Sequence, residues 1–326
     1  MQLSQKSFDL LRGAKNLLAF SGGVDSSALF FLLSESGVEF DIAIVDYGVR
    51  EASRDELSYA KELASRFTLA CHTLEAPHIE ANFEAEARRI RYEFFEELIA
   101  KHNYKNLITA HHLGDQLEWF LMQLSKGAGV FELAGMSEVE QRGSFRVVRP
   151  LLGVQKSELV EFLHSIDEKY FVDESNFGDK YRRNYFRHAI SDPLLERYGE
   201  GIKRSLEYIR EDLDLFSLPE FRLLGELGVA KSSTDARLDE VAIDRHLKKR
   251  GYLMSRGERA RLRDESSVEV GRRFVVVKSG GFLYVVPRVD PKPLLSREFK
   301  ELCRTRAIHK DLRGYLFLNQ DLLELL

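Results

Sequence analysis

The chain has 326 residues, 44% of them hydrophobic and 31% charged, and a formal net charge of −4. The length suits about two globular domains, and no apolar run approaches the roughly 20 residues needed to cross a bilayer. A membrane protein is therefore excluded, and the overall charge does not indicate a general nucleic-acid binder. The N-terminus lacks the apolar core of a signal peptide, so we expect a cytoplasmic protein.

Cys71 and Cys303 are far apart and belong to no Cys-x-x-Cys pair. This spacing argues against a disulfide scaffold, an iron–sulfur cluster and a four-cysteine zinc site. Two ordinary structural cysteines are the simpler interpretation, and a single catalytic thiol is the alternative.

Strand and helix patterns alternate along the first part of the chain. Short apolar runs predict four strands, and the segments between them predict helices. The expected strands are 16–20, 41–46, 69–74 and 106–110, and the expected helices are 28–33, 53–66, 83–102 and about 114–125. This order predicts an α/β fold with a doubly wound parallel sheet. Ligands bind such sheets beyond the carboxyl ends of the strands, which here carry Ser21–Ser27, Asp46–Arg50 and His111–Asp115.

The rest of the chain has a different character. We expect a helix at 155–168, an Arg-rich polar segment at 173–190, and helical structure at 193–224. Two further helices, at 238–250 and 255–263, precede a hairpin whose strands, 273–278 and 282–286, flank Ser279-Gly280-Gly281. The sequence thus predicts a first domain at 1–200, a helical connector at 201–229 and a small α+β domain at 230–290. Residues 291–326 form a C-terminal tail without an assigned role.

A phosphate-binding loop is expected directly after the first strand. It reads Ser21-Gly22-Gly23-Val24-Asp25-Ser26-Ser27 and opens a helix. Glycines let backbone N–H groups approach an anion, and the helix N-terminus adds a favourable dipole. Asp25 beside a phosphate makes sense if Mg²⁺ bridges the two groups. The alternative is a tight turn with a serine helix cap. Neither the Gly-x-x-x-x-Gly-Lys-Ser/Thr loop nor Gly-x-Gly-x-x-Gly is present.

This loop resembles that of the N-type ATP pyrophosphatases, which cleave ATP between the α and β phosphates and adenylate a carbonyl or amide-like oxygen. Further motifs narrow the resemblance to the tRNA(Ile)-lysidine synthetases, over about residues 16–193. In chain order they are Ala87–Tyr92, His111–Glu118, Lys126–Gly129, Leu133–Met136, Arg149–Leu152 with Lys156, Asp173–Asn176 and Tyr181–Arg187.

The resemblance implies a set of site residues. Positions matching Arg91, Asp115 and Glu118 line the substrate pocket in that family, and Arg183 matches the first arginine of its Arg-Asn-x-x-Arg motif. Asp115 and Glu118 lie one helical turn apart and could hold an ammonium group, or could simply favour the helix dipole. Taken alone, the arginine pairs Arg88/Arg91 and Arg183/Arg187 read as solvated helix faces.

Two nearby features stay open. His111 and His112 could form a metal or acid–base pair, or one could pack under the loop. In addition, the family usually shows histidines where this chain has Ile44 and Tyr47, within Ala43-Ile44-Val45-Asp46-Tyr47-Gly48. A histidine role is therefore unsupported there, whereas Asp46 or Tyr47 could still contact adenine or ribose.

The resemblance implies an ATP-dependent ligase that forms a C–N bond. Its substrates would be free L-lysine and tRNA(Ile) with a CAU anticodon, and its cofactors ATP and Mg²⁺. Catalytic roles would fall to Asp25, Arg91, Asp115, Glu118 and Arg183. ATP would be held by Ser21, Gly22, Gly23, Val24, Asp25, Ser26 and Ser27, with Asp25 as the metal ligand. The domain at 1–200 would be catalytic, and the oligomeric state is open, with a homodimer as one option.

The domain at 230–290 would bind tRNA. Basic residues crowd it and could contact phosphates, or could lie on two solvated helices: Arg245, Lys248, Lys249, Arg250, Arg256, Arg259, Arg261 and Arg263. Three other classes remain. They are a tRNA thiolase, an amidotransferase-type synthetase that would need a glutaminase partner, and a non-catalytic ATP-regulated RNA-binding protein.

Overall fold

The computed structural model describes residues 1–326 except 2, 49–51, 173–181, 234 and 325–326. The chain divides into two compact units, Met1–Leu213 and Asp214–Leu326. Residues 201–213 continue the last helix of the first unit, and 222–231 supply strands to the second sheet. The connector expected at 201–229 is therefore not a separate region, because both of its halves pack into a neighbouring unit.

In the described part of the first unit, six strands form a sheet in the order β3-β2-β1-β4-β6-β5. The strands β1 (Asn16–Ala19), β2 (Phe40–Asp46), β3 (Cys71–Glu75), β4 (Asn106–Ile108) and β6 (Phe145–Val148) are parallel, and β5 (Val139–Arg142) is an antiparallel edge. The predicted doubly wound parallel sheet is confirmed. The order reverses at β1, whose neighbours are β2 and β4, so the loops after β1 and β4 share one crevice.

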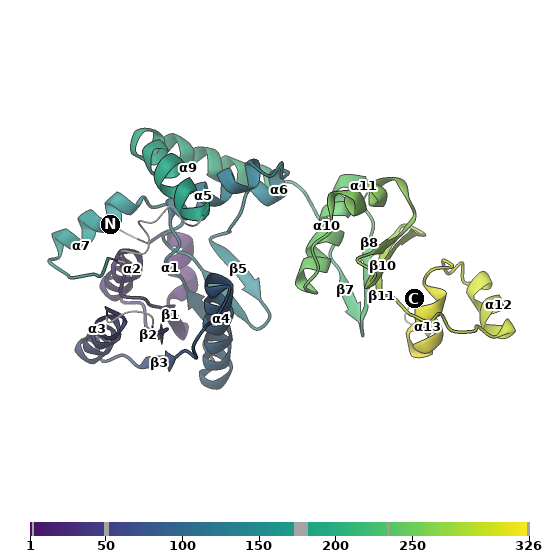
Figure 1. The fold of residues 1–326 in the computed structure, drawn as a ribbon, viewed down its shortest axis with the longest axis horizontal. Coiled ribbons are helices and arrows are strands. Elements are labelled where there is room, and N and C mark those ends of the chain that lie inside the picture. Colours follow the sequence, from purple (N-terminus) through teal and green to yellow (C-terminus); the bar gives the residue numbers. More distant parts are fainter. Residues whose placement is uncertain (2, 49–51, 173–181, 234, 325–326) are drawn as a thin grey trace. The chain divides into compact units, whose positions relative to one another are not determined.

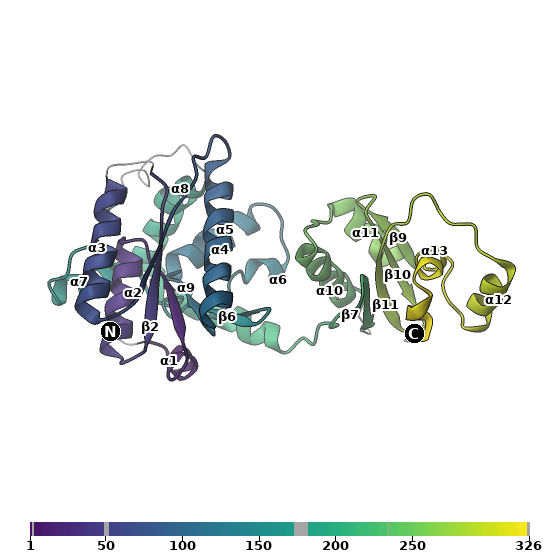
Figure 2. The same cartoon turned by 90° about the horizontal axis from the view of Figure 1, so that it is seen from below.

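Helices cover both faces of this sheet (Figure 2). On one face lie α2 (Val24–Glu35), α3 (Ala52–Phe67) and α7 (Lys156–Ser165), against Leu18, Ile108 and Val148. On the other, α4 (Phe83–His102) packs on Leu17, Leu107 and Val147. Successive strand residues point to opposite faces, which explains why these short strands read as continuous apolar runs. The helix α2 buries Ser26–Leu33 without a break, as expected for a helix that is apolar all round.

The remaining helices of the first unit complete the site region. They are α1 (Gln5–Leu11), α5 (Leu113–Leu124), α6 (Val130–Leu133), α8 (Arg182–Tyr185), the π-helical segment Phe186–Ser191 and α9 (Asp192–Asp214). Leu113 and Leu117 of α5 pack on Leu195 and Leu206 of α9. This contact fixes which side of α5 turns away from α9.

The second unit is a five-stranded antiparallel sheet in the order β7-β8-β11-β10-β9, within the described residues. Its strands are β7 (Arg222–Leu224), β8 (Leu227–Lys231), β9 (Ser267–Val270), β10 (Phe274–Ser279) and β11 (Phe282–Pro287). The expected hairpin is β10–β11. On one face pack α10 (Ala236–Lys249) and α11 (Arg256–Asp264), and on the other α12 (Arg297–Thr305) and α13 (Arg313–Leu318), ahead of a short 3₁₀ helix, Gln320–Glu324 (Figure 1). Residues 291–326, expected as a tail, thus contribute to a core.

Candidate active site

The expected phosphate loop, Ser21–Ser27, follows β1 and includes the first turn of α2. Gly22 has φ +75°, and a Cβ there would lie 3.3 Å from the Phe171 ring, so both backbone and space favour glycine. The backbone N–H of Ser21 donates to Ser26 Oγ at 3.2 Å, and Ser27 Oγ donates to the carbonyl oxygen of Gly22 at 3.2 Å. The serines thus brace the loop from within, and the N-terminus of α2 stays directed at the crevice. An anion is what such a terminus favours.

Asp25 lies in the first turn of α2. Its Oδ2 is 3.8 Å from His112 Nε2, on the loop after β4, whereas its Oδ1 is buried and has no hydrogen-bond partner among the described residues. A buried carboxylate oxygen without a partner is costly, and a divalent cation is a natural ligand for it. The residues therefore fit a Mg²⁺ ion held by Asp25 next to a bound phosphate.

His112 begins α5. Its Nδ1 accepts the backbone N–H of Gly114 at 3.0 Å, and its own backbone N–H donates to Asp115 Oδ2 at 3.0 Å. His112 is therefore the helix cap in a reciprocal capping arrangement. This supports packing beneath the crevice rather than metal binding, and the described residues contain no group of three His, Cys, Asp or Glu side chains that could hold a metal ion.

Asp115 and Glu118 form a buried acid pair on α5, and Glu118 is only 2% exposed. Arg183 donates to both carboxylates, to Asp115 Oδ1 at 2.8 Å and to Glu118 Oε2 at 2.9 Å. Arg187 Nε donates to Glu118 Oε1 at 2.5 Å, and its other guanidinium nitrogen lies 3.6 Å from Asp115 Oδ1. Two predicted residues, Asp115 and Glu118, thus meet a third, Arg183, which lies 65 to 68 positions away along the chain.

The charges in this cluster are strongly coupled. Burial alone would raise the pKa of Asp115, but His112, His111 and Arg183 together hold it below its usual value. The pKa of Arg183 is raised, because the attraction of Asp115 and Glu118 outweighs burial. Burial lowers the pKa of His111 to about 4, against the opposing pull of Asp115. Near neutral pH the site therefore holds an ionised Asp115, a charged Arg183 and a neutral His111.

Arg91 is exposed on α4, and among the described residues it makes no ion pair with Asp115 or Glu118. Burial raises the pKa of Tyr47, and the nearby charge of Arg91 lowers it in part. Tyr47 donates from its hydroxyl to the carbonyl oxygen of Ala87 at 2.9 Å, which ties the end of β2 to α4. Ile44 belongs to the core. Arg91 therefore lies near Tyr47.

Three expected features fall wholly or partly outside the described residues. The Asp173–Asn176 motif lies outside them, as do Val49 and Arg50 of the segment after β2, and Tyr181 of the Tyr181–Arg187 motif. Asp46 itself is described, and its Oδ1 accepts the backbone N–H of Gly48 at 2.8 Å.

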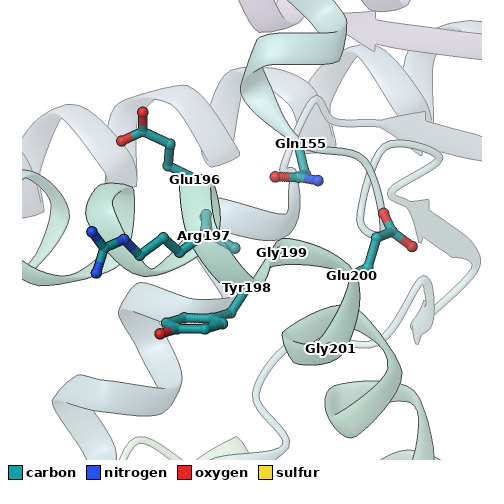
Figure 3. A pocket seen from close by; sticks show the side chains of 8 residues that line it. Gln155, Glu196, Arg197, Tyr198, Gly199, Glu200 and Gly201 are labelled. Carbon is teal, nitrogen blue, oxygen red and sulfur yellow. The ribbon is translucent and has the colours of Figure 1, made fainter.

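The structure also contains a cavity of about 400 Å³ at the kink of α9, where Tyr198 departs from helical backbone angles (Figure 3). Gln155 and residues 195–201 line it. None of them is a predicted site residue, so this cavity does not coincide with the cluster around Asp115.

Comparison with known proteins gives the family of this chain. Residues 2–194 match the PP-loop domain family. A tRNA(Ile)-lysidine synthase of Campylobacter jejuni (strain RM1221) is 40% identical over 317 residues, which are 97% of each chain. The chain belongs to the tRNA(Ile)-lysidine synthase family. A synthase of Helicobacter pylori (strain J99) is 38% identical over 94% of this chain and 90% of the relative, so membership extends through both units.

A solved structure adds evidence on the fold alone. The U34-tRNA thiolase NcsA of Methanococcus maripaludis matches with a TM-score of 0.55 and 17% identity, over 66% of this chain and 78% of that one. The resemblance to the lysidine synthetases, read from the motifs, is confirmed. No helix of the described residues is long and apolar enough to cross a membrane.

The basic cluster of the second unit is largely neutralised by acids within the unit. Lys248 and Arg259 pair with Asp244 at 2.6 and 2.9 Å, and Arg263 pairs with Glu240 at 2.5 Å. Arg250 and Arg261 pair with Glu226 and Glu265. Most of these carboxylates lie within or beside the same two helices, and Asp244 and Glu240 are each 1% exposed.

Sequence reasoning missed two roles in the site. It named Arg187 only as a neighbour of Arg183, although Arg187 forms its own ion pair with Glu118. It also left the role of His112 open. The role of Arg187 could have been predicted from the similar helical spacing of the acid pair and the arginine pair, because buried carboxylates need cationic partners. The capping role could have been read from His112 standing three residues before Asp115.

Proposed function

We propose that this chain uses ATP to join free L-lysine to C2 of the wobble cytidine in a tRNA(Ile) with a CAU anticodon. One observation carries the proposal: in a member of this family, a buried acid pair with cationic partners follows β4, and the phosphate loop follows the neighbouring strand β1. This geometry supports a phosphate site and an ammonium site in one crevice.

In the first step, O2 of the cytosine attacks the α-phosphorus of ATP and pyrophosphate leaves. Backbone N–H groups of the Ser21–Ser27 loop and the N-terminus of α2 would bind the phosphates. Asp25 would hold Mg²⁺, which neutralises charge on the phosphate oxygens. The target base lies in a single-stranded loop, so it can be splayed into the crevice without melting a duplex.

In the second step, the ε-amine of lysine attacks C2, and the former O2 leaves with AMP. The ionised Asp115 and Glu118 would balance the ammonium charge of lysine. Arg183 and Arg187 hold these carboxylates in the structure, so at least one guanidinium must release its carboxylate as lysine enters. The triphosphate or the adenylated base, both of which are anionic, would attract the released guanidinium. The attacking amine must also lose a proton, and the low pKa of His111 makes that residue a weak acceptor.

A tRNA-modifying reaction also fits a cytoplasmic place of action. Arg91, exposed on α4, would meet substrate phosphates from the side of Tyr47. A homodimer is one option for the assembly. Sedimentation of the purified chain in the analytical ultracentrifuge would measure the oligomeric state.

A thiolase is the less supported function. Burial raises the pKa of both Cys71 and Cys303, which disfavours the reactive thiolate. Cys303 lies in the core of the second unit.

The test is incorporation of labelled lysine into tRNA(Ile) with a CAU anticodon, in the presence of ATP and Mg²⁺. We expect lysine in the RNA, with AMP and pyrophosphate as products, and none with methionine tRNA. Losing one partner of a buried charge pair costs about 2–5 kcal/mol, so Asp115→Asn should reduce the rate by about 100-fold. Asp212→Asn, on the exposed part of α9, is the matched control. Pyrophosphate release without lysine incorporation would leave an ATP pyrophosphatase with another substrate.

A further inference from the structure

Trp119 is the single tryptophan of the chain and lies on α5, directly after Glu118. At 3.6 residues per turn, the positions 115, 118 and 119 fall within about 100° of one another around the helix. The opposite side of α5 packs on α9 through Leu113 and Leu117. Trp119 therefore belongs to the side of α5 that carries the acid pair, but unlike that pair it is 43% exposed.

The indole ring is held in place from one side. Its Nε1 donates to the carbonyl oxygen of Glu132 in α6 at 2.8 Å. Gly135, with φ +66°, lies beneath the ring, and a Cβ there would come within 2.6 Å of Trp119 Cδ1. The segment around α6 thus lies against the five-membered ring of the indole, and α5 and α6 are adjacent in Figure 1. Trp119 nevertheless remains 43% exposed.

An exposed tryptophan whose N–H is already bonded offers a fixed apolar surface and no further hydrogen bond. Burying such a surface against a flat partner is favourable, and unpaired nucleobases are recognised in this way. Lys126 is exposed in the turn that links α5 to α6, so a cation for a phosphate stands near the same segment. Free lysine is a poorer match, because its ammonium groups are served by the buried carboxylates.

We propose that Trp119 is a stacking platform for an unpaired base of the anticodon loop, next to the base that enters the crevice. This inference rests on the proposed function for the identity of the RNA. The platform would position the loop while adding nothing to the chemical steps, and it would be insensitive to the identity of the stacked base.

The single tryptophan provides a direct measurement on the unmodified full chain. Its fluorescence, excited where tyrosine does not absorb, is followed while the anticodon stem-loop of tRNA(Ile) is added. We expect saturable quenching by the stem-loop and none by the stem duplex without its loop. Bound stem-loop, detected by filter retention, that leaves the emission unchanged would overturn the proposal. Quenching by L-lysine alone would assign the ring to the amino acid instead.

Kinetics provide the second measurement. Stacking on an aromatic ring contributes about 1–3 kcal/mol per base, so Trp119→Ala should raise KM for tRNA about 5- to 150-fold. The KM for lysine and kcat at saturating tRNA should stay within about twofold. Trp119→Tyr should restore most of the tRNA affinity, and Trp119→Leu should not.

Tyr208→Ala is the matched control, because Tyr208 is a 57% exposed aromatic on α9. A merely structural Trp119 would lower the melting temperature in all variants and leave KM for tRNA unchanged, which would contradict the platform. The fluorescence measurement needs no turnover. If lysine incorporation fails while the loop still quenches, the proposed function falls and the platform stands.

Discussion

At the scale of single residues, the acid pair shows what local sequence can and cannot determine. The loop after β1 could be proposed as a phosphate site from the sequence, because its glycines, serines and Asp25 are contiguous and closely follow an apolar strand that ends at Ala19. The partners of Asp115 and Glu118 were not. Arg183 and Arg187 reach them through tertiary packing, and a basic segment with helical spacing is by itself equally compatible with a solvated face.

The partly buried His111 should make stability depend on pH. In the unfolded chain its imidazole titrates near pH 6.5, whereas burial lowers the folded pKa to about 4. Between these values the unfolded state binds a proton that the folded state does not. The free energy of unfolding should therefore fall as pH decreases from about 6.5 to 4, by up to about 1.4 kcal/mol per pH unit from this group.

The measurement is chemical denaturation of the full chain at several pH values, with probes for each unit. His111→Gln should flatten the dependence in the first unit. His246 of the second unit has a pKa lowered by burial to about 4 as well, so His246→Gln is the matched variant there. An unaltered slope in His111→Gln would show that other groups carry the dependence.

At the scale of elements, long or strongly patterned segments were predicted well. The helix expected at 83–102 is α4, and the hairpin around Ser279-Gly280-Gly281 is β10–β11. The prediction failed for short polar edge strands such as β5, Val139-Glu140-Gln141-Arg142, and for β7. Such strands carry little apolar periodicity, and they form because a neighbouring strand offers unpaired backbone groups.

The pairing of α10 with α11 changes which basic residues are candidates for RNA. Lys249 and Arg256 are exposed, whereas Lys248 and Arg259 are tied to the buried Asp244. We expect Lys249→Glu with Arg256→Glu to weaken tRNA binding several-fold and to reduce its salt dependence, with the melting temperature unchanged.

Arg259→Ala is the informative comparison. Removing one partner of a buried ion pair costs about 3–5 kcal/mol, so this variant should lower the stability of the second unit. Unchanged tRNA affinity in the Lys249/Arg256 double variant, measured across a salt series, would exclude this surface as a phosphate contact.

At the scale of the whole molecule, the division into two units was anticipated but the extent of the second was not. The apolar residues Phe299, Leu302 and Cys303 follow helical spacing, but the sequence analysis left residues 291–326 without an assigned structure. Yet α12 and α13 supply Phe299, Cys303 and Leu316 to a core shared with Val277 and Val286 of the sheet. Val277 of β10 and Val286 of β11 are apolar and lie on a face that the hairpin alone leaves uncovered. These residues were the sequence signal that a further segment packs on the sheet.

Deletion of residues 291–326 should therefore unfold the second unit. The segment buries Phe299, Cys303, Leu312, Tyr315, Leu316, Leu322 and Leu323. At about 1.5–3 kcal/mol for each large apolar side chain, the loss matches or exceeds the usual stability of a domain. Circular dichroism melting of the truncated chain against the full chain is the measurement, and a second unit that still melts cooperatively at the same temperature would contradict it.

The pairing of β1 with β4 has a consequence for how the enzyme comes into being. Asn106 Nδ2 donates a hydrogen bond to Asn16 Oδ1 across these strands at 2.7 Å, although 90 positions separate the two residues. The phosphate loop and the acid pair follow these two strands, so neither local helix formation nor collapse of one half of the unit can bring them together. Closing so large a loop costs conformational entropy before the contacts between the two strands can offset it. Catalytic competence is thus acquired only when the centre of the sheet is complete, and a partly synthesised chain that ends before β4 cannot turn over ATP on RNA.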